Sequence, residues 1–135
     1  MKTTITCKSY FDATHRMSPA PKEPYARWHG HRYDVEVTAY TRAWSNLPLD
    51  EFRAGVHTLL AAYDHCTLTW VGDPDGCRNE GAVVFDAQPT METIAHALYL
   101  QAAQWLKEQH GLELASVRVS SQPDVFVEVA NDCHA

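Results

Sequence analysis

The sequence predicts an α+β fold built in the order β-β-α-α-β-β, and three observations predict it. Apolar and polar side chains alternate through residues 31–43, which is the pattern of a strand with one buried face. Apolar side chains recur at helical spacing through residues 50–63 and again after residue 89. Two short valine-rich runs follow the second helical segment. A chain of 135 residues suits one domain, so we expect residues 1–135 to form a single unit.

The first half of the chain is expected to hold two strands and a helix. Residues 2–14 are rich in β-branched and aromatic side chains, which favour a strand. Prolines at positions 19, 21 and 24 predict a loop before the second strand, because proline fixes φ and lacks an N–H. The second strand ends before residue 46. Asp50 is then the predicted N-cap of a helix that runs to about Tyr63.

The second half is expected to hold a helix and two strands after a long loop. Residues 64–88 are predicted to be irregular, and a connection of this length inside a compact domain is usually functional or mobile. Pro89 and Thr90 start the second helix, Glu92 complements its dipole, and Gly111 ends it. The last two strands cover residues 117–119 and 125–129, and they are joined around residues 122–124.

Composition restricts the class of partner. Eleven Lys and Arg residues against 17 Asp and Glu residues give a formal net charge of −6, which disfavours binding to nucleic acid or to an acidic membrane. No apolar run reaches the roughly 20 residues that span a bilayer, and the N-terminus lacks a secretory apolar region, so we expect a cytoplasmic protein. The four cysteines are widely spaced and are expected to be reduced thiols. Open sheet edges predict a homo-oligomer.

Three histidines predict a metal site. His29 and His31 flank Gly30 at the start of the second strand, and side chains two residues apart on a strand point the same way. His15 follows the first strand and can approach from the neighbouring strand. Three neutral imidazoles leave the fourth position of a tetrahedral cation open, as catalytic zinc sites do. Iron, nickel and copper also suit imidazole ligands. The alternative is that these histidines are ordinary polar strand residues.

The order of these motifs resembles the superfamily of 6-pyruvoyltetrahydropterin synthase and 6-carboxytetrahydropterin synthase. The resemblance covers nearly the whole chain. Each matching motif is weak alone, and their occurrence together in this order points to the fold and the metal site. The motifs are Phe11-x-Ala13-x-His15-Arg16, His29-Gly30-His31 followed by Tyr33, Asp64-His65, and Pro89-Thr90-x-Glu92-x-x-Ala95.

The resemblance implies a T-fold, in which a four-stranded antiparallel sheet carries two helices on one face. In that family, subunits form ring-like trimers whose sheets join into a barrel, and two rings commonly stack into a hexamer. His15, His29 and His31 match the family's zinc ligands, and Asp64 and His65 match its acid–base pair. The family's usual substrate is dihydroneopterin triphosphate, whose side-chain hydroxyls bind the zinc and become more acidic.

The chain departs from the family pattern at the second base. The family carries a catalytic Cys just before the His-Gly-His motif, often four residues ahead of it, where this chain has Tyr25. No Cys occurs between Met17 and Trp28. Some relatives use a Glu instead, which makes Glu23 the candidate base, although Glu23 also fits a solvated loop carboxylate. Tyr25 is a second candidate beside the substrate, but a phenol with a pKa near 10 needs a cation to act as a base.

A second departure concerns substrate recognition. The family's third strand usually ends in a Glu that grips the pyrimidinone edge of the pterin, and Ser121 stands at that position here. A Ser hydroxyl cannot accept a pair of N–H donors as a carboxylate does. Loss of such a buried contact costs on the order of several kcal/mol. Gln122, Asp124 and Glu128 are the candidate replacements.

Three functions remain open on the sequence. The first is a zinc-dependent lyase of the pterin synthase type, which acts on dihydroneopterin triphosphate or a related heterocycle. The second is a paralogue recruited to a biosynthetic pathway with a non-pterin substrate, which both departures favour. The third is a non-catalytic zinc or ligand-binding scaffold, which has no need of an imidazole beside the metal.

Overall fold

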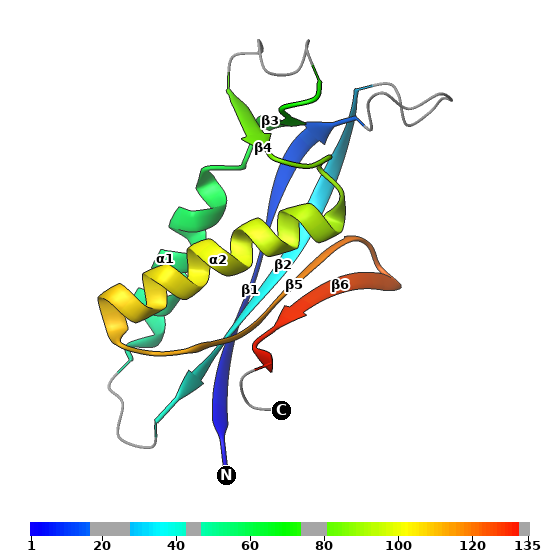
Figure 1. Ribbon diagram of the computed structural model, residues 1–135. Coiled ribbons are helices and arrows are strands. Elements are labelled where there is room, and N and C mark those ends of the chain that lie inside the picture. Colours follow the sequence, from blue (N-terminus) through cyan, green and yellow to red (C-terminus); the bar gives the residue numbers. More distant parts are fainter. Residues whose placement is uncertain (17–27, 43–46, 74–80, 133–135) are drawn as a thin grey trace.

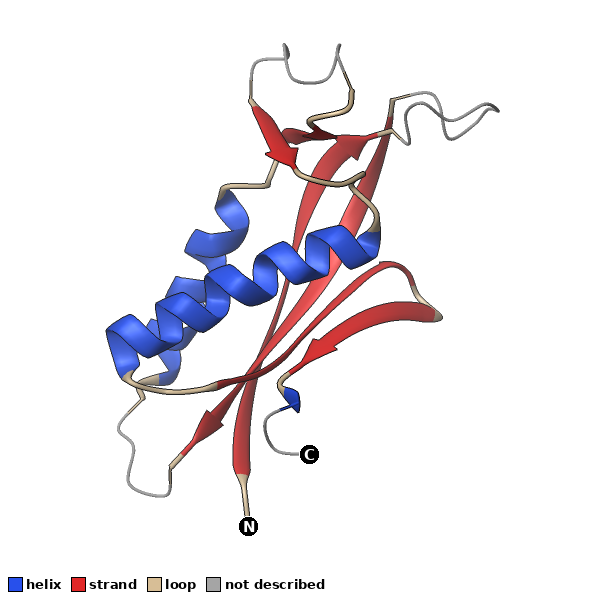
Figure 2. Cartoon of the chain, viewed as in Figure 1, coloured by secondary structure: helices blue, strands red, loops and turns tan. Residues whose placement is uncertain are grey.

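The computed structural model describes residues 1–16, 28–42, 47–73 and 81–132. One twisted sheet forms the body of the protein, and both helices cover the same face of it (Figures 1 and 2). The strand order in the sheet is β4-β3-β1-β2-β5-β6. The elements are β1 (Thr3–His15), β2 (His29–Thr41), α1 (Leu49–Ala61), β3 (Cys66–Trp70), β4 (Ala82–Phe85), α2 (Met91–His110), β5 (Leu114–Gln122) and β6 (Val125–Ala130).

The long antiparallel pair of β1 and β2 organises the sheet. Its register runs without a break from Thr3 opposite Thr41 to His15 opposite His29. Side chains alternate between the two faces of a strand, and the face under the helices holds the buried rings of Phe11 and Tyr33, which stack with centroids 5.0 Å apart. The predicted alternation of this strand is therefore confirmed, and it directs the histidines toward the helix-covered face.

The sheet has six strands, so the prediction of a four-stranded antiparallel sheet was wrong. The two additional strands, β3 and β4, lie within residues 64–88, which the sequence predicted to be irregular. They pair in parallel with each other, and β3 pairs in parallel with β1 through residues 13–15. Strands of five and four residues carry little periodic signal. Parallel pairing also joins strands through crossovers rather than through recognisable hairpin turns.

Both helices form where the periodicity predicts them, with one correction at the start of α1. Pro48 is the N-cap residue, and Asp50 lies in the first turn, where its charge complements the helix dipole instead of capping an N–H. The α2 helix begins as predicted, because the Thr90 side chain accepts a hydrogen bond from the Thr93 N–H at 3.2 Å. Gly111 ends α2 in the left-handed conformation, with φ of 63°.

Three sheet edges lack a strand partner in the part of the chain that the structure describes, and one of them is β4, which pairs only with β3. Along β1, residues 3–12 pair only with β2, since β3 reaches only residues 13–15. At the third edge, β6 pairs only with β5. Among the described residues, no helix is long and apolar enough to cross a bilayer.

Replacing Thr90 with Ala should lower the free energy of unfolding by about 1 kcal/mol, because the first turn of α2 loses its side-chain acceptor. Thr90→Ser keeps the hydroxyl and should stay close to the wild-type protein. Urea denaturation followed by circular dichroism measures the difference. Equal loss in both variants would show that the methyl group, and not the cap, matters at this position.

Candidate metal and active site

The three histidines meet at the end of the sheet where β1 finishes and β2 begins. His15 and His29 are directly opposite each other in the last pair of the ladder, and His31 lies two residues further along β2 on the same face. Their ring centroids are 4.4 Å apart for His15 and His29, 4.9 Å for His15 and His31, and 4.8 Å for His29 and His31. One nitrogen of each ring lies within 4.8 Å of the others.

Burial favours the neutral form of two of these imidazoles, those of His15 and His31. His15 is 8% exposed, and burial is the main reason that its pKa falls to about 4, with His29 and His31 lowering it further. The pKa of His31 is also lowered, first by burial and then by His29. His15 Nδ1 lies 2.9 Å from the carbonyl oxygen of Pro89, at the start of α2. A protonated Nδ1 donates this bond and leaves the lone pair of Nε2 for a metal.

The donor set fits a metal ion with an exchangeable position. A neutral imidazole need not lose a proton before it coordinates a cation, and burial favours that form at His15 and His31. In the described part of the chain, no carboxylate or thiolate belongs to the cluster. A three-histidine set is that of catalytic zinc rather than structural zinc, which usually has four protein ligands including Cys. The donors are also compatible with iron, nickel or copper.

Asp64 and His65 form a hydrogen-bonded pair at the edge of β1. His65 Nδ1 lies 2.9 Å from Asp64 Oδ2. The backbone of Asp12 holds the pair in place, because its N–H donates to Asp64 Oδ1 at 3.0 Å and its carbonyl accepts from the His65 N–H at 2.6 Å. The pKa of Asp64 is lowered, chiefly by the Asp12 N–H and then by His65. Asp64 is therefore a carboxylate that orients the imidazole.

His65 and one histidine of the cluster line the same pocket. The His65 side chain is 80% exposed, and it lines a cavity of about 450 Å³ together with His31. The other lining residues come from the ends of β1 and β2, namely Asp12, Ala13, Thr14, Gly30 and Arg32. The geometry thus brings the predicted acid–base pair to the same pocket as one predicted metal ligand.

Cys66 directly follows His65, where the backbone is not extended. His65 has φ of 58°, the left-handed region that non-glycine residues rarely adopt. The Cys66 thiol is half-buried and donates to the Ala62 carbonyl at 3.3 Å. The thiol also lies 3.5 Å from the Asp64 carbonyl oxygen, so its two acceptors are main-chain oxygens at and just after the end of α1.

The remaining predicted site residues have different outcomes. Glu23 and Tyr25 lie outside the described residues. Ser121 is half-buried near the start of α2, where its hydroxyl lies 3.6 Å from the Met91 sulfur. Gln122 is exposed at the end of β5. Of the candidate replacements for the pterin-anchoring Glu, Glu128 points to the face opposite the helices, where it accepts a bond from Arg118 at 3.1 Å.

One feature of the site was missed from the sequence. Asp73 is 1% exposed and accepts two hydrogen bonds from Arg16, at 2.8 and 2.6 Å. Arg16 directly follows a predicted metal ligand and was noted only as part of a motif. An Asp beside Gly and Pro is typical of an exposed turn, so no signal in the sequence marked it as buried.

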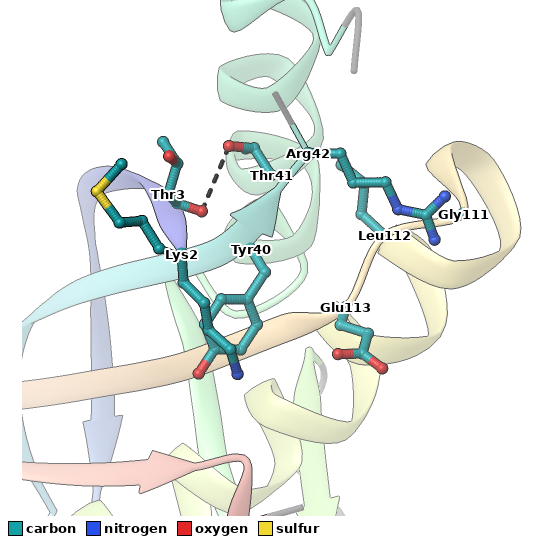
Figure 3. Close-up of a pocket in the computed structure, with 9 residues that line it drawn as sticks. Lys2, Thr3, Tyr40, Thr41, Arg42, Gly111, Leu112 and Glu113 are labelled. Carbon is teal, nitrogen blue, oxygen red and sulfur yellow. Dashed lines mark hydrogen bonds between the residues drawn. The ribbon is translucent and has the colours of Figure 1, made fainter. Parts of the chain in front are cut away.

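A second pocket, of about 440 Å³, lies at the far end of the β1–β2 pair (Figure 3). Lys2 Nζ lies 4.8 Å from the centroid of the Tyr40 ring, and the Thr41 hydroxyl donates to the Thr3 carbonyl at 3.3 Å. Lys2 and Tyr40 are separated from the histidines by most of the length of both strands. This pocket is therefore separate from the metal cluster.

Comparisons with known proteins agree with the fold. The sequence profile of the family described as 6-pyruvoyl tetrahydropterin synthase matches residues 4–132. Among solved structures, an uncharacterized protein from Wolinella succinogenes has a TM-score of 0.73 at 17% identity, covering 98% of this chain and 99% of that chain. A Plasmodium vivax 6-pyruvoyltetrahydropterin synthase, carrying alanine in place of a catalytic glutamate, has a TM-score of 0.73 at 16% identity, with coverage of 97% and 98%.

The Caenorhabditis elegans 6-pyruvoyl tetrahydropterin synthase has a TM-score of 0.68 at 18% identity, covering 98% of this chain and 97% of that chain. At these identities the likeness concerns the fold alone. No curated protein matches the sequence of the chain.

The metal-free protein should lose stability as the pH falls from about 6.5 to about 4. Above this window His15 is neutral in both states; within it, the unfolded chain binds a proton that the folded protein does not, which favours unfolding. The full loss is roughly 3 kcal/mol. Urea denaturation in a chelator-containing buffer, at several pH values, measures it. His15→Asn should reduce the slope of the unfolding free energy against pH. His96→Asn, on the exposed side of α2, should leave that slope unchanged. A wild-type slope in His15→Asn would contradict the assignment of the loss to His15.

Proposed function

This chain belongs to the 6-pyruvoyl tetrahydropterin synthase family, and from that premise we propose that it is a zinc-dependent lyase acting on dihydroneopterin triphosphate or a related heterocycle. One observation carries the proposal. The three-histidine cluster and the Asp64–His65 pair border the same pocket, through His31 and His65. A metal centre and an oriented base at one pocket are what a proton-transferring lyase needs.

His15, His29 and His31 would hold the metal. Zinc bound there would act as a Lewis acid that acidifies a hydroxyl of the substrate. The hydrogen bond from His15 Nδ1 to Pro89 fixes the orientation of that ring, so the start of α2 takes part in shaping the centre. Of the three histidines, His31 lines the pocket of about 450 Å³, and we propose that the substrate enters there.

Asp64 and His65 would move the proton. The carboxylate keeps the hydrogen on Nδ1 of His65, so Nε2 is left with a lone pair that can accept a proton from the substrate. The same carboxylate stabilises the imidazolium that results. The hydrogen bonds from Asp12 hold both residues against β1, which limits the rotation of the pair relative to His31.

Glu23 is the proposed second base. A glutamate is named as the catalytic residue of the structurally similar Plasmodium vivax enzyme, which supports a carboxylate in place of the missing Cys. Glu23 and Tyr25 both precede the first residue of β2 by a few positions, so the chain leads from them directly to His29. Tyr25 is proposed to contact the substrate.

A second candidate function, a reaction on a non-pterin substrate, is favoured by the residues at Ser121 and Gln122. The hydroxyl of Ser121 lies near a methionine sulfur, a weak acceptor, and the candidate replacement Glu128 pairs with Arg118 instead. The metal and proton-transfer residues match the family pattern, whereas the anchor for the pterin ring does not. A catalytically inactive scaffold is disfavoured, because it would not need the aligned Asp64–His65 pair.

Zinc-loaded protein incubated with dihydroneopterin triphosphate should release triphosphate and change the pterin absorbance spectrum. His65→Gln should lower the turnover number by at least about 100-fold, since the amide cannot accept the proton. His96→Gln removes an exposed imidazole on α2 and should leave turnover unchanged. Phosphate analysis and absorbance follow the reaction. Tight zinc binding without any turnover would reject the pterin substrate and leave the recruited paralogue, whereas full activity in His65→Gln would reject the assigned base.

The open edges support a homo-oligomer. On the face opposite the helices, charges alternate in sign across four neighbouring strands, in the cross-strand pairs Lys8–Glu36, Glu36–Arg118 and Arg118–Glu128. The row begins with a cation on the open edge of β1 and ends with an anion on the open edge of β6. Because β6 is antiparallel to β1 in the sheet, copies joined head to tail would continue both the antiparallel pairing and the charge row. We propose a closed ring of this kind, either a trimer or a stacked hexamer.

Reversing one end of the row should weaken this assembly. Glu128→Lys places like charges at the proposed β6–β1 contact and should cost about 1 kcal/mol per interface. The double variant Lys8→Glu, Glu128→Lys restores opposite charges across the contact and should recover part of the assembly. Sedimentation velocity at low salt measures the oligomeric state. A monomeric wild-type protein, or a Glu128→Lys variant that assembles normally, would argue against the head-to-tail arrangement.

A further inference from the structure

Three residues outside the histidine cluster join the two strand ends that carry metal ligands. Arg16 directly follows His15, and Trp28 directly precedes His29. The Arg16 guanidinium carbon lies 4.7 Å from the centroid of the Trp28 ring. Its Nε and Nη2 atoms donate to the two carboxylate oxygens of Asp73, at 2.8 and 2.6 Å. Arg16, Trp28 and Asp73 are called the clamp below.

The clamp lies where the strand ladder stops. His15 and His29 form the last pair of β1 and β2 among the residues that the structure describes, and on its other side His15 pairs with Leu68 of β3. Ends of secondary structure open more easily than their interiors. A planar guanidinium that stacks on the ring from one strand end, and is itself attached to the other, ties the two ends together just beyond the ligands.

Asp73 anchors the clamp to a third segment. Its side chain is 1% exposed, and the Arg16 side chain is 17% exposed. A buried carboxylate is tolerated only when it is paired and hydrogen-bonded, and the two-pronged contact with Arg16 provides both. The Asp73 N–H donates to the Trp70 carbonyl at 3.0 Å, which fixes the carboxylate relative to β3. Movement of the guanidinium away from Asp73 would therefore leave a buried carboxylate without its cation.

We infer that Arg16, Trp28 and Asp73 are positioning residues for the metal centre, which hold His15 and His29 at the spacing needed to bind a cation. This inference rests on the proposed metal centre. It assigns to the clamp two physical effects. The clamp limits the rearrangement that metal binding requires, and Asp73 neutralises the cation next to His15 that would otherwise repel a divalent metal.

The two effects can be separated by substitution. Arg16→Lys keeps the charge but loses the fork and the planar stacking surface. Trp28→Leu keeps the ion pair and removes the ring. Asp73→Asn removes the negative charge and keeps the size of the side chain. A role in charge balance alone predicts weaker metal binding only in Asp73→Asn, whereas the positioning role predicts weaker binding in all three variants.

The test measures the affinity of the full-length protein for Zn²⁺ by competition with a chelator, and the visible spectrum of the Co²⁺-loaded protein. We expect the dissociation constant to rise about tenfold in each clamp variant, with a weaker or shifted tetrahedral Co²⁺ band. Asp50→Asn and Arg53→Lys are the matched controls, because they alter an exposed ion pair on α1, with atoms 3.6 Å apart, and should bind metal as the wild-type protein does.

Wild-type affinity and an unchanged Co²⁺ band in folded clamp variants would overturn the inference and leave the clamp with a stabilising role alone. Loss confined to Asp73→Asn would overturn the positioning part in the same way. If Asp73→Asn does not fold, Arg16→Lys and Trp28→Leu decide, since both retain the buried carboxylate with a cation beside it. A wild-type protein that binds neither ion would overturn the proposed metal centre together with the inference.

Discussion

The register between β1 and β2 is the constraint on which the rest of the site depends. Side chains alternate with a period of two, so a slip of one residue would send a histidine of one strand to the opposite face from its partners. The register is fixed along its length by buried pairs such as Phe11 opposite Tyr33, and on the outer face by the Thr6–Thr38 hydroxyl contact of 2.7 Å. The histidines occupy the end of the β1–β2 pair, and the contacts that fix their register lie further along the two strands.

The short parallel strand β3 positions the Asp64–His65 pair beside β1. Its first pair sets Cys66 opposite Ala13, and the two preceding residues are Asp64 and His65. The Asp64–His65 pair is thus placed beside Asp12, three residues before His15 along β1, and His65 lines the same pocket as His31. The left-handed backbone at His65 costs free energy for a residue with a side chain. The hydrogen bonds to Asp12 on both sides offset that cost and hold the imidazole in a conformation that an isolated loop would leave.

Features that depend on neighbouring residues in the chain could be predicted from the sequence, and features that depend on distant residues could not. The common face of His29 and His31 depends only on local alternation, and the start of α2 depends on one side chain, Thr90; both were predicted. The pairing of β3 with β1 and the burial of Asp73 depend on partners more than 50 positions away, Ala13 and Arg16, and nothing near them in the chain announces those contacts. The N-cap of α1 was predicted wrongly for a local reason. Asp50 is a good capping residue, but Pro48 already has a conformation suited to the helix start and takes the N-cap position.

The site therefore divides into a part set by the sheet and a part set by the ends of the elements around it. The proposed metal ligands are part of the β1–β2 ladder, and the proposed proton-transferring pair is hydrogen-bonded to Asp12 of β1, so a change of residue there would disturb the sheet as well as the chemistry. Ser121 and Gln122 stand at the end of β5, where the backbone leaves the sheet and side chains carry little packing. We expect substrate recognition at such a position to change with less cost to the fold than a change within the β1–β2 ladder. That asymmetry would explain how this chain has the three histidines and the Asp64–His65 pair of the family pattern, while Ser121 stands where the resemblance leads us to expect a carboxylate.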